Sequence, residues 1–485
     1  MSHSTPSPRS NPSPFRHRPR TARRSYKPAP DPRTTKPKGI STAWTRVRRL
    51  IWSWPPWAAV CVYFVAQGDW WKAFAAGAWA GLCSLSIPAE LPPQYGFDHR
   101  LTVGSDDFLY TMAGAAGVPL EAGNTLELLN NGDRFYPSML AAINGAERSI
   151  TIEAYIYWAG EIGLTFAKAL AERAAHGVRV KILLDAVGSS TVGNEILEIL
   201  REGGCHVAWY NPLRWNRLRR LNNRTHRKSL IVDGRIGFTG GAGIADHWTG
   251  DAQDDQHWRD LQIRMAGPAV RPLQTGFAQN WLECTRELVT GPDFYPDLPP
   301  AGPLALQTVM SSPETGASAA RVMYCLAISA AHHSIEIANP YFVPDHLAID
   351  LFRDAVRRGV KVRIMVAGTS NDNWIARLNS IRLYGALLEA GVELLEYNRT
   401  MLHHKTMVVD GLWATVGTTN FDSRSFAYNE ENNVCLCDAG VSRELNEMFE
   451  DDARWCERVD LERWRRRPLL DKALQALASF VQDQI

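Results

Sequence analysis

The sequence predicts an α/β protein made of two similar layered halves that share one active site, preceded by a hydrophobic hairpin. A strand–helix–strand pattern at residues 149–184 recurs at residues 334–366, and a His-x-Lys motif follows each copy. Matching positions lie 185 residues apart at the first strand (149 and 334), 182 at the second (177 and 359) and 177 at the motif (226 and 403). Such a slow drift is expected when loops change length after an internal duplication. Strands that alternate with helices predict a sheet covered by helices in each half.

The length of 485 residues is too great for one ordinary domain, and changes in composition along the chain predict the boundaries. We expect a disordered basic tail at 1–49, membrane-anchoring hydrophobic segments at 50–90, a first half at 97–300, and a second half with a C-terminal helix at 301–485. With 45% hydrophobic residues the chain can form a core without a disulfide or a metal. The eight cysteines are scattered, and Cys435 and Cys437 do not have zinc-site spacing. We therefore expect reduced thiols. We also expect no metal or other cofactor, because lysines of the motif described below supply positive charge.

Positive charge is concentrated at the N-terminus. Residues 1–49 hold 13 of the 53 Lys and Arg residues and one acidic residue, Asp31, so the rest of the chain has a net charge of about −10. This distribution argues against a broad nucleic-acid-binding surface. Two interpretations of the tail remain open, a polybasic arm on anionic lipid and a solvated segment without a partner.

Two apolar segments, residues 50–66 and 70–87, are separated by a polar break at 67–69. Each is at the short end of the range for a membrane-spanning helix, about 17 to 25 residues, and their tryptophans suit the bilayer interface. We expect a two-pass hairpin that leaves both of its ends in the cytoplasm. A single span and an interfacial or re-entrant hairpin are the alternatives.

The motif His-x-Lys followed by Asp occurs once in each half. Its members are His226, Lys228, Asp233, His403, Lys405 and Asp410. Each copy leads into an Asp-Gly pair, which predicts a strand, a tight turn and a return strand. Side chains at i and i+2 of a strand share a face, so each histidine should point with its lysine, while Arg227 and His404 point elsewhere. The two aspartates lie seven residues after their histidines, and we expect them to support the site rather than touch the substrate.

These residue types suit the transfer of a phosphodiester. Two lysines can bind the non-bridging oxygens and neutralise charge that grows in the transition state. One neutral imidazole can attack phosphorus, and a second, protonated one can donate to the leaving oxygen. One histidine cannot perform both tasks at once, so the duplication supplies what the chemistry requires. The strands that follow end in Gly240–Gly241 and in Gly417–Asn420, where backbone can approach a ligand closely.

Several segments together resemble the phospholipase D superfamily, and most closely the bacterial cardiolipin synthases. They are residues 223–228 with the following strand, 258–262, 339–345, 401–411, 417–426 and 429–431. The resemblance covers roughly residues 120–470. It implies two phospholipase D-type halves and a phosphatidyl transfer through phosphohistidine, in which two phosphatidylglycerols become cardiolipin and glycerol.

The resemblance also implies roles for individual residues. His226 would be the nucleophile and His403 the acid and base, although the sequence itself does not order them. Asp260 and Glu431 would orient the histidines. The residues expected at the substrate phosphate, besides the lysines, are Asn420, Gly241 and Thr418. Phospholipids and the bacterial cell membrane are the expected partners, with the catalytic body in the cytoplasm and no nucleic acid.

One position departs from the family pattern: Gly243 stands where an asparagine is common and where the second half has Asn420. We expect an adjusted site rather than an inactive one. The alternatives to a cardiolipin synthase are a phospholipase D-type hydrolase, a nuclease of the superfamily, and an inactive lipid-binding scaffold. Two further segments have open interpretations. The basic residues 214–220 could contact lipid headgroups or be solvated, and the amphipathic residues 469–481 could pack on the body or lie on the membrane.

Overall fold

The computed structural model describes residues 54–85, 95–97, 100–212, 222–313 and 318–479. The predicted tail at 1–49 and the basic segment at 214–220 lie outside these residues.

The described residues form one large mixed sheet that runs through both halves. The strands of the first half are β1 (Glu121–Asn130), β2 (Ser149–Ala154), β3 (Arg179–Asp185), β4 (His206–Tyr210), β5 (Arg224–Thr225), β6 (Ser229–Val232), β7 (Ile236–Gly240) and β8 (Leu261–Ala266). Those of the second half are β9 (Leu304–Ser311), β10 (Ser334–Ala338), β11 (Lys361–Ala367), β12 (Glu393–Tyr397), β13 (Lys405–Val409), β14 (Trp413–Gly417), β15 (Asn429–Cys437) and β16 (Cys456–Arg458).

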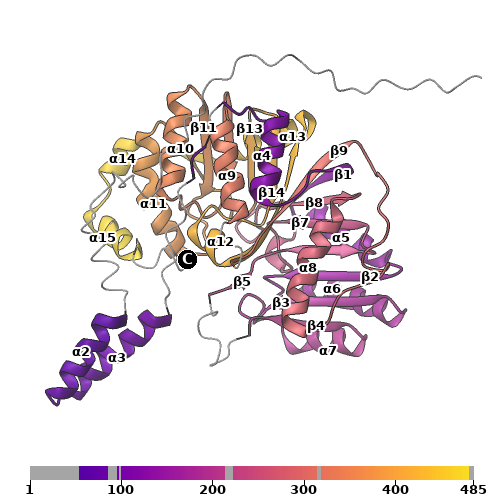
Figure 1. The fold of residues 1–485 in the computed structure, drawn as a ribbon, viewed down its shortest axis with the longest axis horizontal. Helices are drawn as coiled ribbons and strands as arrows, with labels where there is room; N and C mark the ends of the chain where they lie inside the picture. The colour runs from indigo at the N-terminus through magenta and orange to yellow at the C-terminus, as the bar shows by residue number, and fades with distance from the viewer. Residues whose placement is uncertain (1–53, 86–94, 98–99, 213–221, 314–317, 480–485) are drawn as a thin grey trace, which may run out of the picture. The chain divides into compact units, whose positions relative to one another are not determined.

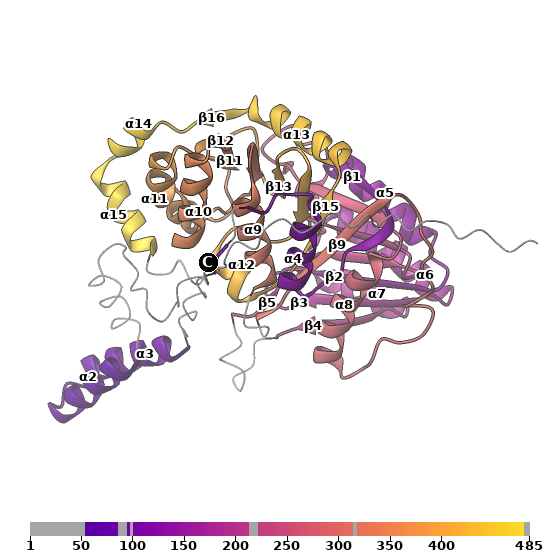
Figure 2. The same cartoon turned by 45° about the horizontal axis from the view of Figure 1, so that its top comes forward.

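The order of the strands confirms the internal repeat. The two halves meet where β1 pairs with β9 (Figures 1 and 2). Outward from that pair the first half runs β1-β8-β7-β6-β2-β3-β4, and the second runs β9-β15-β14-β13-β10-β11-β12. In each half three neighbouring strands are parallel, β2-β3-β4 and β10-β11-β12, and the inner ones are antiparallel; in the second half β16 adds an antiparallel edge strand to β12. The strands predicted near 149–153, 177–184, 205–210, 334–337, 359–366 and 392–397 are all present.

Helices cover both faces of the sheet, because the outer strands are apolar on both sides. In β3, Val180, Ile182 and Leu184 pack into one cluster, while Leu183 packs into another on the opposite face. The helices of the first half are α5 (Gly132–Asn144), α6 (Glu161–Ala175), α7 (Asn194–Glu202) and α8 (Val270–Thr285). The helix α4 (Asp106–Ala116) precedes them in the chain but packs in the core of the second half, where Phe108 meets Trp413 edge-on. Those of the second half are α9 (Ala319–Ala330), α10 (His346–Arg357), α11 (Trp374–Glu389), α12 (Ser423–Ala427), α13 (Ala439–Ala453), α14 (Leu461–Arg465) and α15 (Leu469–Ala478).

The two apolar segments before the catalytic body contain the helices α2 (Trp54–Ala66) and α3 (Trp70–Leu85). The helices pack on each other, with the rings of Trp57 and Trp79 in edge contact at 6.3 Å. Their connection contains Gly68, in a left-handed conformation (φ 74°). Within the part of the chain that the structure describes, neither these helices nor any other combines the length and the apolar character needed to cross a bilayer.

The two Asp-Gly turns are confirmed, but their aspartates lie away from the histidines. Asp233 and Asp410 both have positive φ, 53° and 54°, as a tight hairpin turn requires. The carboxylate of Asp233 accepts the N–H of Ser149 at 2.9 Å, and that of Asp410 accepts the N–H of Ser334 at 2.9 Å. Each carboxylate also accepts the two preceding amides. These contacts hold the start of β2 and β10, at the end of each hairpin opposite the histidines, so the aspartates support the hairpin turns rather than the site as expected.

The expected strand position of the histidines is also corrected. His226 and Lys228 precede β6, and His403 precedes β13, which begins at Lys405. The backbone leaves its own hairpin here because it pairs with the other half: the N–H of His226 donates to the carbonyl of Glu430 at 2.9 Å.

Candidate active site

Each His-x-Lys segment lies beside a segment of the other half. β5, just before His226, pairs in parallel with the start of β15. The N–H of His403 donates to the carbonyl of Arg259 at 2.8 Å, in a parallel bridge between the two halves. The residues that follow on these partner segments are Glu431 and Asp260. The fold therefore places one carboxylate from each half next to the histidine of the other.

Two carboxylate–histidine pairs result. Nδ1 of His226 lies 3.0 Å from both oxygens of Glu431, and Nδ1 of His403 lies 2.7 Å from Oδ2 of Asp260. Both carboxylates are fully buried. An Nδ1–H that donates to a carboxylate fixes the tautomer and leaves Nε2 free for chemistry. These are the contacts that histidine-orienting residues need.

The two carboxylates are supported differently. Glu431 accepts hydrogen bonds from the hydroxyl of Thr418 and from Nδ2 of Asn429 (3.2 Å). Asp260 accepts one from the indole of Trp248 at 2.8 Å. A Cβ on Gly241 would lie 2.1 Å from Oδ1 of Asp260, so only glycine leaves room for this carboxylate.

These contacts give a structural role to two residues that were expected at the substrate phosphate. Gly241 and Thr418 were expected to bind substrate, but each contacts the carboxylate of its own half. Sequence reasoning placed the glycine near a ligand, whereas the close approach is to a side chain of the same protein.

The two lysines lie beside the histidines. Nζ of Lys228 is 3.0 Å from the carbonyl of His226, and Nζ of Lys405 is 3.2 Å from Nε2 of His403. Both side chains are buried, and neither forms an ion pair with a residue that the structure describes. Arg227 and His404, between each histidine and lysine, point away as predicted, toward Glu430 and Asp452.

Burial dominates the electrostatics of the four groups. It lowers the pKa of Lys228 to about 7, with repulsion from Lys405 as the next cause, and it lowers that of Lys405 to about 8. Burial also lowers the pKa of His226 to about 4 and that of His403 to about 3. Burial would raise the pKa of Asp260 and Glu431, but the adjacent histidines and lysines outweigh it and leave both below their ordinary values. Burial therefore disfavours positive charge in the site, and a bound anion would relieve this.

Asn420, in the same segment as Thr418, has a side-chain oxygen that is unpaired within the part of the chain that the structure describes. Its side chain is 6% exposed, and its Oδ1 has no hydrogen-bond partner among the described residues. The corresponding space in the first half is filled, because a Cβ on Gly243 would lie 2.8 Å from the carbonyl of Ile156 and 3.1 Å from the ring of Trp248. The missing asparagine is thus replaced by packing, not by an empty space.

Aromatic rings surround the histidines, and sequence reasoning did not identify them. Tyr155 meets His226 edge-on at 5.2 Å, and Trp248 and Trp258 lie 5.3 and 5.6 Å from His403. His247 stacks on Trp258 at 4.7 Å. Trp258 could have been found from the sequence, because it immediately precedes Arg259 and Asp260, but nothing in the sequence marked Tyr155.

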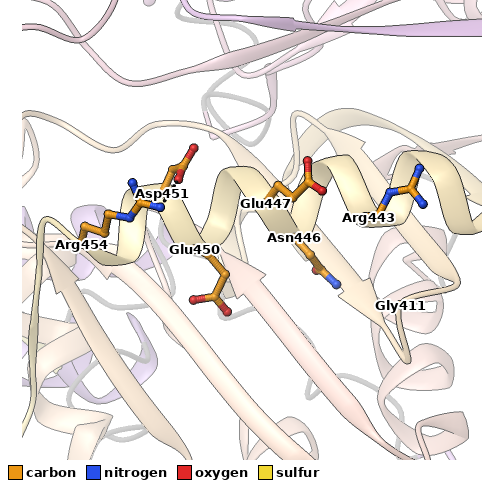
Figure 3. Close-up of a pocket in the computed structure, with 7 residues that line it drawn as sticks. All are labelled: Gly411, Arg443, Asn446, Glu447, Glu450, Asp451 and Arg454. Carbon is orange, nitrogen blue, oxygen red and sulfur yellow. Dashed lines mark ion pairs between the residues drawn. The ribbon is translucent and has the colours of Figure 1, made fainter.

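A separate surface groove lies along α13. It is lined by Gly411, Arg443, Asn446, Glu447, Glu450, Asp451 and Arg454 (Figure 3). It contains none of the residues of the two histidine pairs, so it is not the candidate site.

Comparison with known proteins identifies the family. A family model described as cardiolipin synthase, PLD-like domain, matches residues 139–259 and 324–453, one segment in each half. The chain belongs to this family.

Relatives of similar length support the same assignment. The chain is 33% identical over 379 residues to the major cardiolipin synthase ClsA of Bacillus subtilis, covering 78% of each chain. It is 35% identical over 366 residues to the cardiolipin synthase of Geobacillus kaustophilus, covering 75% of this chain and 73% of that one. The resemblance to cardiolipin synthases seen in the motifs is confirmed.

A solved structure has the same fold. The phosphatidylserine synthase of Haemophilus influenzae Rd KW20 superposes with a TM-score of 0.59 at 13% identity, covering 78% of this chain and all of that one. The likeness shows that the two-half fold of the cardiolipin synthase family extends to distant sequences.

Gly241→Ala should displace Asp260 from His403, because the added Cβ would overlap Oδ1 of Asp260. A misplacement of about 1 Å near a reacting group costs roughly 10²-fold in rate, so we expect kcat to fall by that amount. Gly114→Ala is the matched control, because nothing lies within 4 Å of a Cβ at Gly114. Steady-state kinetics of both variants test this, and a wild-type kcat for Gly241→Ala would contradict it.

Sulfate should bind to the site less tightly as the pH rises. Lysine is charged only below its pKa, so raising the pH from about 6 to about 9 takes Lys228 and Lys405 through their pKa values of about 7 and 8. The charge of sulfate is constant over this range. We expect its Kd, measured by calorimetry, to rise at least about tenfold, and to rise less in Lys228→Met. A flat Kd in the wild-type protein would show that the two lysines do not bind the anion.

Proposed function

We propose that this chain is a phosphatidyltransferase that joins two phosphatidylglycerols into cardiolipin and glycerol. The observation that carries the proposal is the pair of histidines from opposite halves, each hydrogen-bonded to a buried carboxylate, with two buried lysines beside them. Membership of the cardiolipin synthase family supports the choice of substrate.

The first step forms a phosphohistidine. Nε2 of His226 attacks the phosphorus of one phosphatidylglycerol, the bond to the glycerol oxygen breaks, and His403 donates a proton to that oxygen. Lys228, Lys405 and the Nδ2–H of Asn420 donate to the non-bridging oxygens. The roles of the two histidines follow from the family resemblance.

The second step reverses the proton transfer. His403, now neutral, accepts the hydroxyl proton of a second phosphatidylglycerol, whose oxygen attacks the phosphorus and releases His226. His403 must be protonated for the first step, although burial lowers its pKa to about 3. A bound phosphodiester adds negative charge beside it, and Asp260 also favours the imidazolium, so substrate binding is accompanied by uptake of a proton.

The rest of the chain supports attachment to a bacterial cell membrane. We propose that residues 50–90 attach the protein to lipid and that residues 97–300 and 301–485 form the two catalytic halves on the cytoplasmic side. The basic tail at 1–49 would lie on anionic headgroups. The packing at Gly243 weakens the case for an inactive scaffold, since the position is filled.

Replacing either histidine should stop turnover. In phosphatidylglycerol micelles the wild type should release glycerol and form a four-chain lipid. His226→Ala removes the nucleophile, and His403→Ala should lose about 10²- to 10⁴-fold because general acid–base catalysis is lost. His206→Ala, an exposed histidine on β4, is the control.

Product analysis distinguishes the alternatives. Full activity in either site variant would disprove the two-histidine mechanism. Phosphatidic acid as the main wild-type product would identify a hydrolase instead.

A further inference from the structure

The helix α15 exposes its apolar side and buries its polar side. Leu469, Leu470, Leu474 and Leu477 are 82%, 69%, 40% and 62% exposed, whereas Gln475 is only 3% exposed. At 100° per residue these leucines, with Ala473 and Ala476, span one face about 160° wide. We call these six residues the leucine face. A surface helix of a soluble protein has the opposite arrangement.

Polar contacts hold α15 in this orientation. Nε of Arg467 donates to Oε1 of Gln475 at 2.9 Å, and Nδ2 of Asn379 in α11 donates to the carbonyl of Ala478 at 3.0 Å. Just before α15, the indole of Trp464 donates to a carbonyl of α11 at 2.7 Å. The exposure of the leucines is therefore a consequence of specific contacts on the other side of the helix.

The segment that carries the leucine face has a positive net charge, although Arg463 and Arg465 pair with Glu457 and Glu389 outside it. Residues 461–472 contain five basic side chains and two acidic ones, a net charge of +3, although the chain beyond residue 49 has a net charge of about −10. The basic residues are Arg463, Arg465, Arg466, Arg467 and Lys472. A helix with an apolar face and flanking arginines fits the interface of an anionic bilayer, where long basic side chains reach the headgroups.

We propose that the leucine face docks on the surface of a bilayer that contains anionic phospholipid. This inference rests on the proposed function, because it brings the body to the lipid on which the site acts. The leucines enter the boundary of the acyl chains, and the arginines of α14 lie at the level of the headgroups.

The test compares two forms of the substrate with the full chain. We substitute Leu469, Leu470 and Leu477 together by Gln, and use Leu288→Gln, at an exposed leucine of the first half, as the control. Turnover of phosphatidylglycerol in vesicles should fall by at least about tenfold in the triple variant, because transfer of one leucine is already worth about that factor. Turnover of monomeric dihexanoyl-phosphatidylglycerol should not change.

Three outcomes would overturn the proposal. They are unchanged turnover on vesicles, an equal loss on vesicles and monomers, and a loss of dimer in light scattering, which would place a second copy of the chain on the face. If the wild type turns over neither substrate, the proposed function fails. Co-flotation of the same variants with phosphatidylglycerol vesicles then tests the docking without turnover. We expect less of the triple variant than of the wild type to float with the vesicles.

A second, independent observation concerns buried ion pairs behind the histidines. Arg227 follows His226, and Glu430 precedes Glu431; their side chains pair at 2.6 Å and are almost fully buried. Nη1 of Arg227 also donates to the carbonyl of Gly276 at 2.9 Å.

The second histidine has a similar arrangement. Arg259 precedes Asp260, and its Nε donates to Oδ1 of Asp452 in α13 at 2.9 Å. Nε2 of His404, which follows His403, lies 3.4 Å from the same carboxylate. Although the outer side of α13 carries the charged groove (Figure 3), Asp452 is 6% exposed.

Each ion pair joins the two halves at the register of a histidine pair. Neighbouring side chains of an extended segment point to opposite sides. The ion pairs therefore lie on the side of the paired segments that faces away from the histidines, and they restrict sliding of one segment along the other.

We infer that Arg227 with Glu430, and Arg259 with Asp452, are positioning residues for the two carboxylate–histidine pairs. The inference rests on the proposed function, but its test uses a second phosphodiester, bis(p-nitrophenyl) phosphate, whose leaving group needs little help from an acid.

Double variants separate positioning from stability. Removing one partner leaves a buried unpaired charge, whereas removing both does not. We therefore compare Arg227→Met/Glu430→Gln and Arg259→Met/Asp452→Asn with the control Lys181→Met/Glu287→Gln, an ion pair between β3 and the segment after α8 (2.7 Å). The first two should fold, keep the KM of the wild type and lose roughly 10²-fold in kcat. The control should keep kcat.

Loss of the two ion pairs should affect activity differently on substrates with different leaving groups. Arg259→Met/Asp452→Asn should lose less activity on bis(p-nitrophenyl) phosphate than on phosphatidylglycerol, because His403 is the acid. Arg227→Met/Glu430→Gln should lose the same fraction of its activity on both substrates.

A wild-type kcat in either folded double variant, or an equal loss in the control, would overturn the inference. Should a double variant not fold, Arg227→Lys and Arg259→Lys replace it, and a wild-type kcat there overturns the inference too. If the wild type turns over bis(p-nitrophenyl) phosphate but not phosphatidylglycerol, the proposed function is refuted, and the p-nitrophenyl ester still tests the ion pairs.

Discussion

The hydrogen bond between each histidine and a carboxylate of the opposite half is the contact on which the site depends. His226 with Glu431, and His403 with Asp260, are buried and joined at 3.0 and 2.7 Å. Neither half contains a complete pair, because each supplies its carboxylate to the other. The parallel backbone pairing at β5–β15 and at Arg259–Leu402 brings these groups together. The continuous sheet through β1 and β9 holds the halves in register.

Burial gives the site its preference for an anion. Two ammonium groups and two imidazoles share a small buried volume, and the pKa values of all four are lowered. Such buried positive groups are unfavourable for folding when no anion pairs with them. The cost is reversed when a phosphodiester enters, since each charge then gains a partner. The buried positive groups thus account both for the affinity for the substrate and for the cost in folding free energy of the protein alone.

The sequence predicted the repeat and the four central side chains because each is encoded locally, whereas the two carboxylates came from the family resemblance. Alternation along an extended segment placed His226 with Lys228 and turned Arg227 away. The contacts of Asp233, Gly241 and Thr418 were not foreseen because they form only in the folded chain: Asp233 holds the start of β2, and the other two contact carboxylates of their own halves. Tyr155 and Asp452 were not foreseen, since only the folded chain brings them to the histidines or to the ion pairs.

The different support of the two carboxylates has a consequence for how the halves can diverge. A short carboxylate, Asp260, goes with a residue that has no side chain, Gly241, and a longer one, Glu431, goes with a hydroxyl, Thr418. Each partnership lies within one half, yet the imidazole that it serves belongs to the other. A change in one member can therefore be compensated by a change in the same half, whereas its effect on chemistry appears at the histidine of the other half. Two copies that began alike could drift apart in this way without either losing the ability to complete its neighbour.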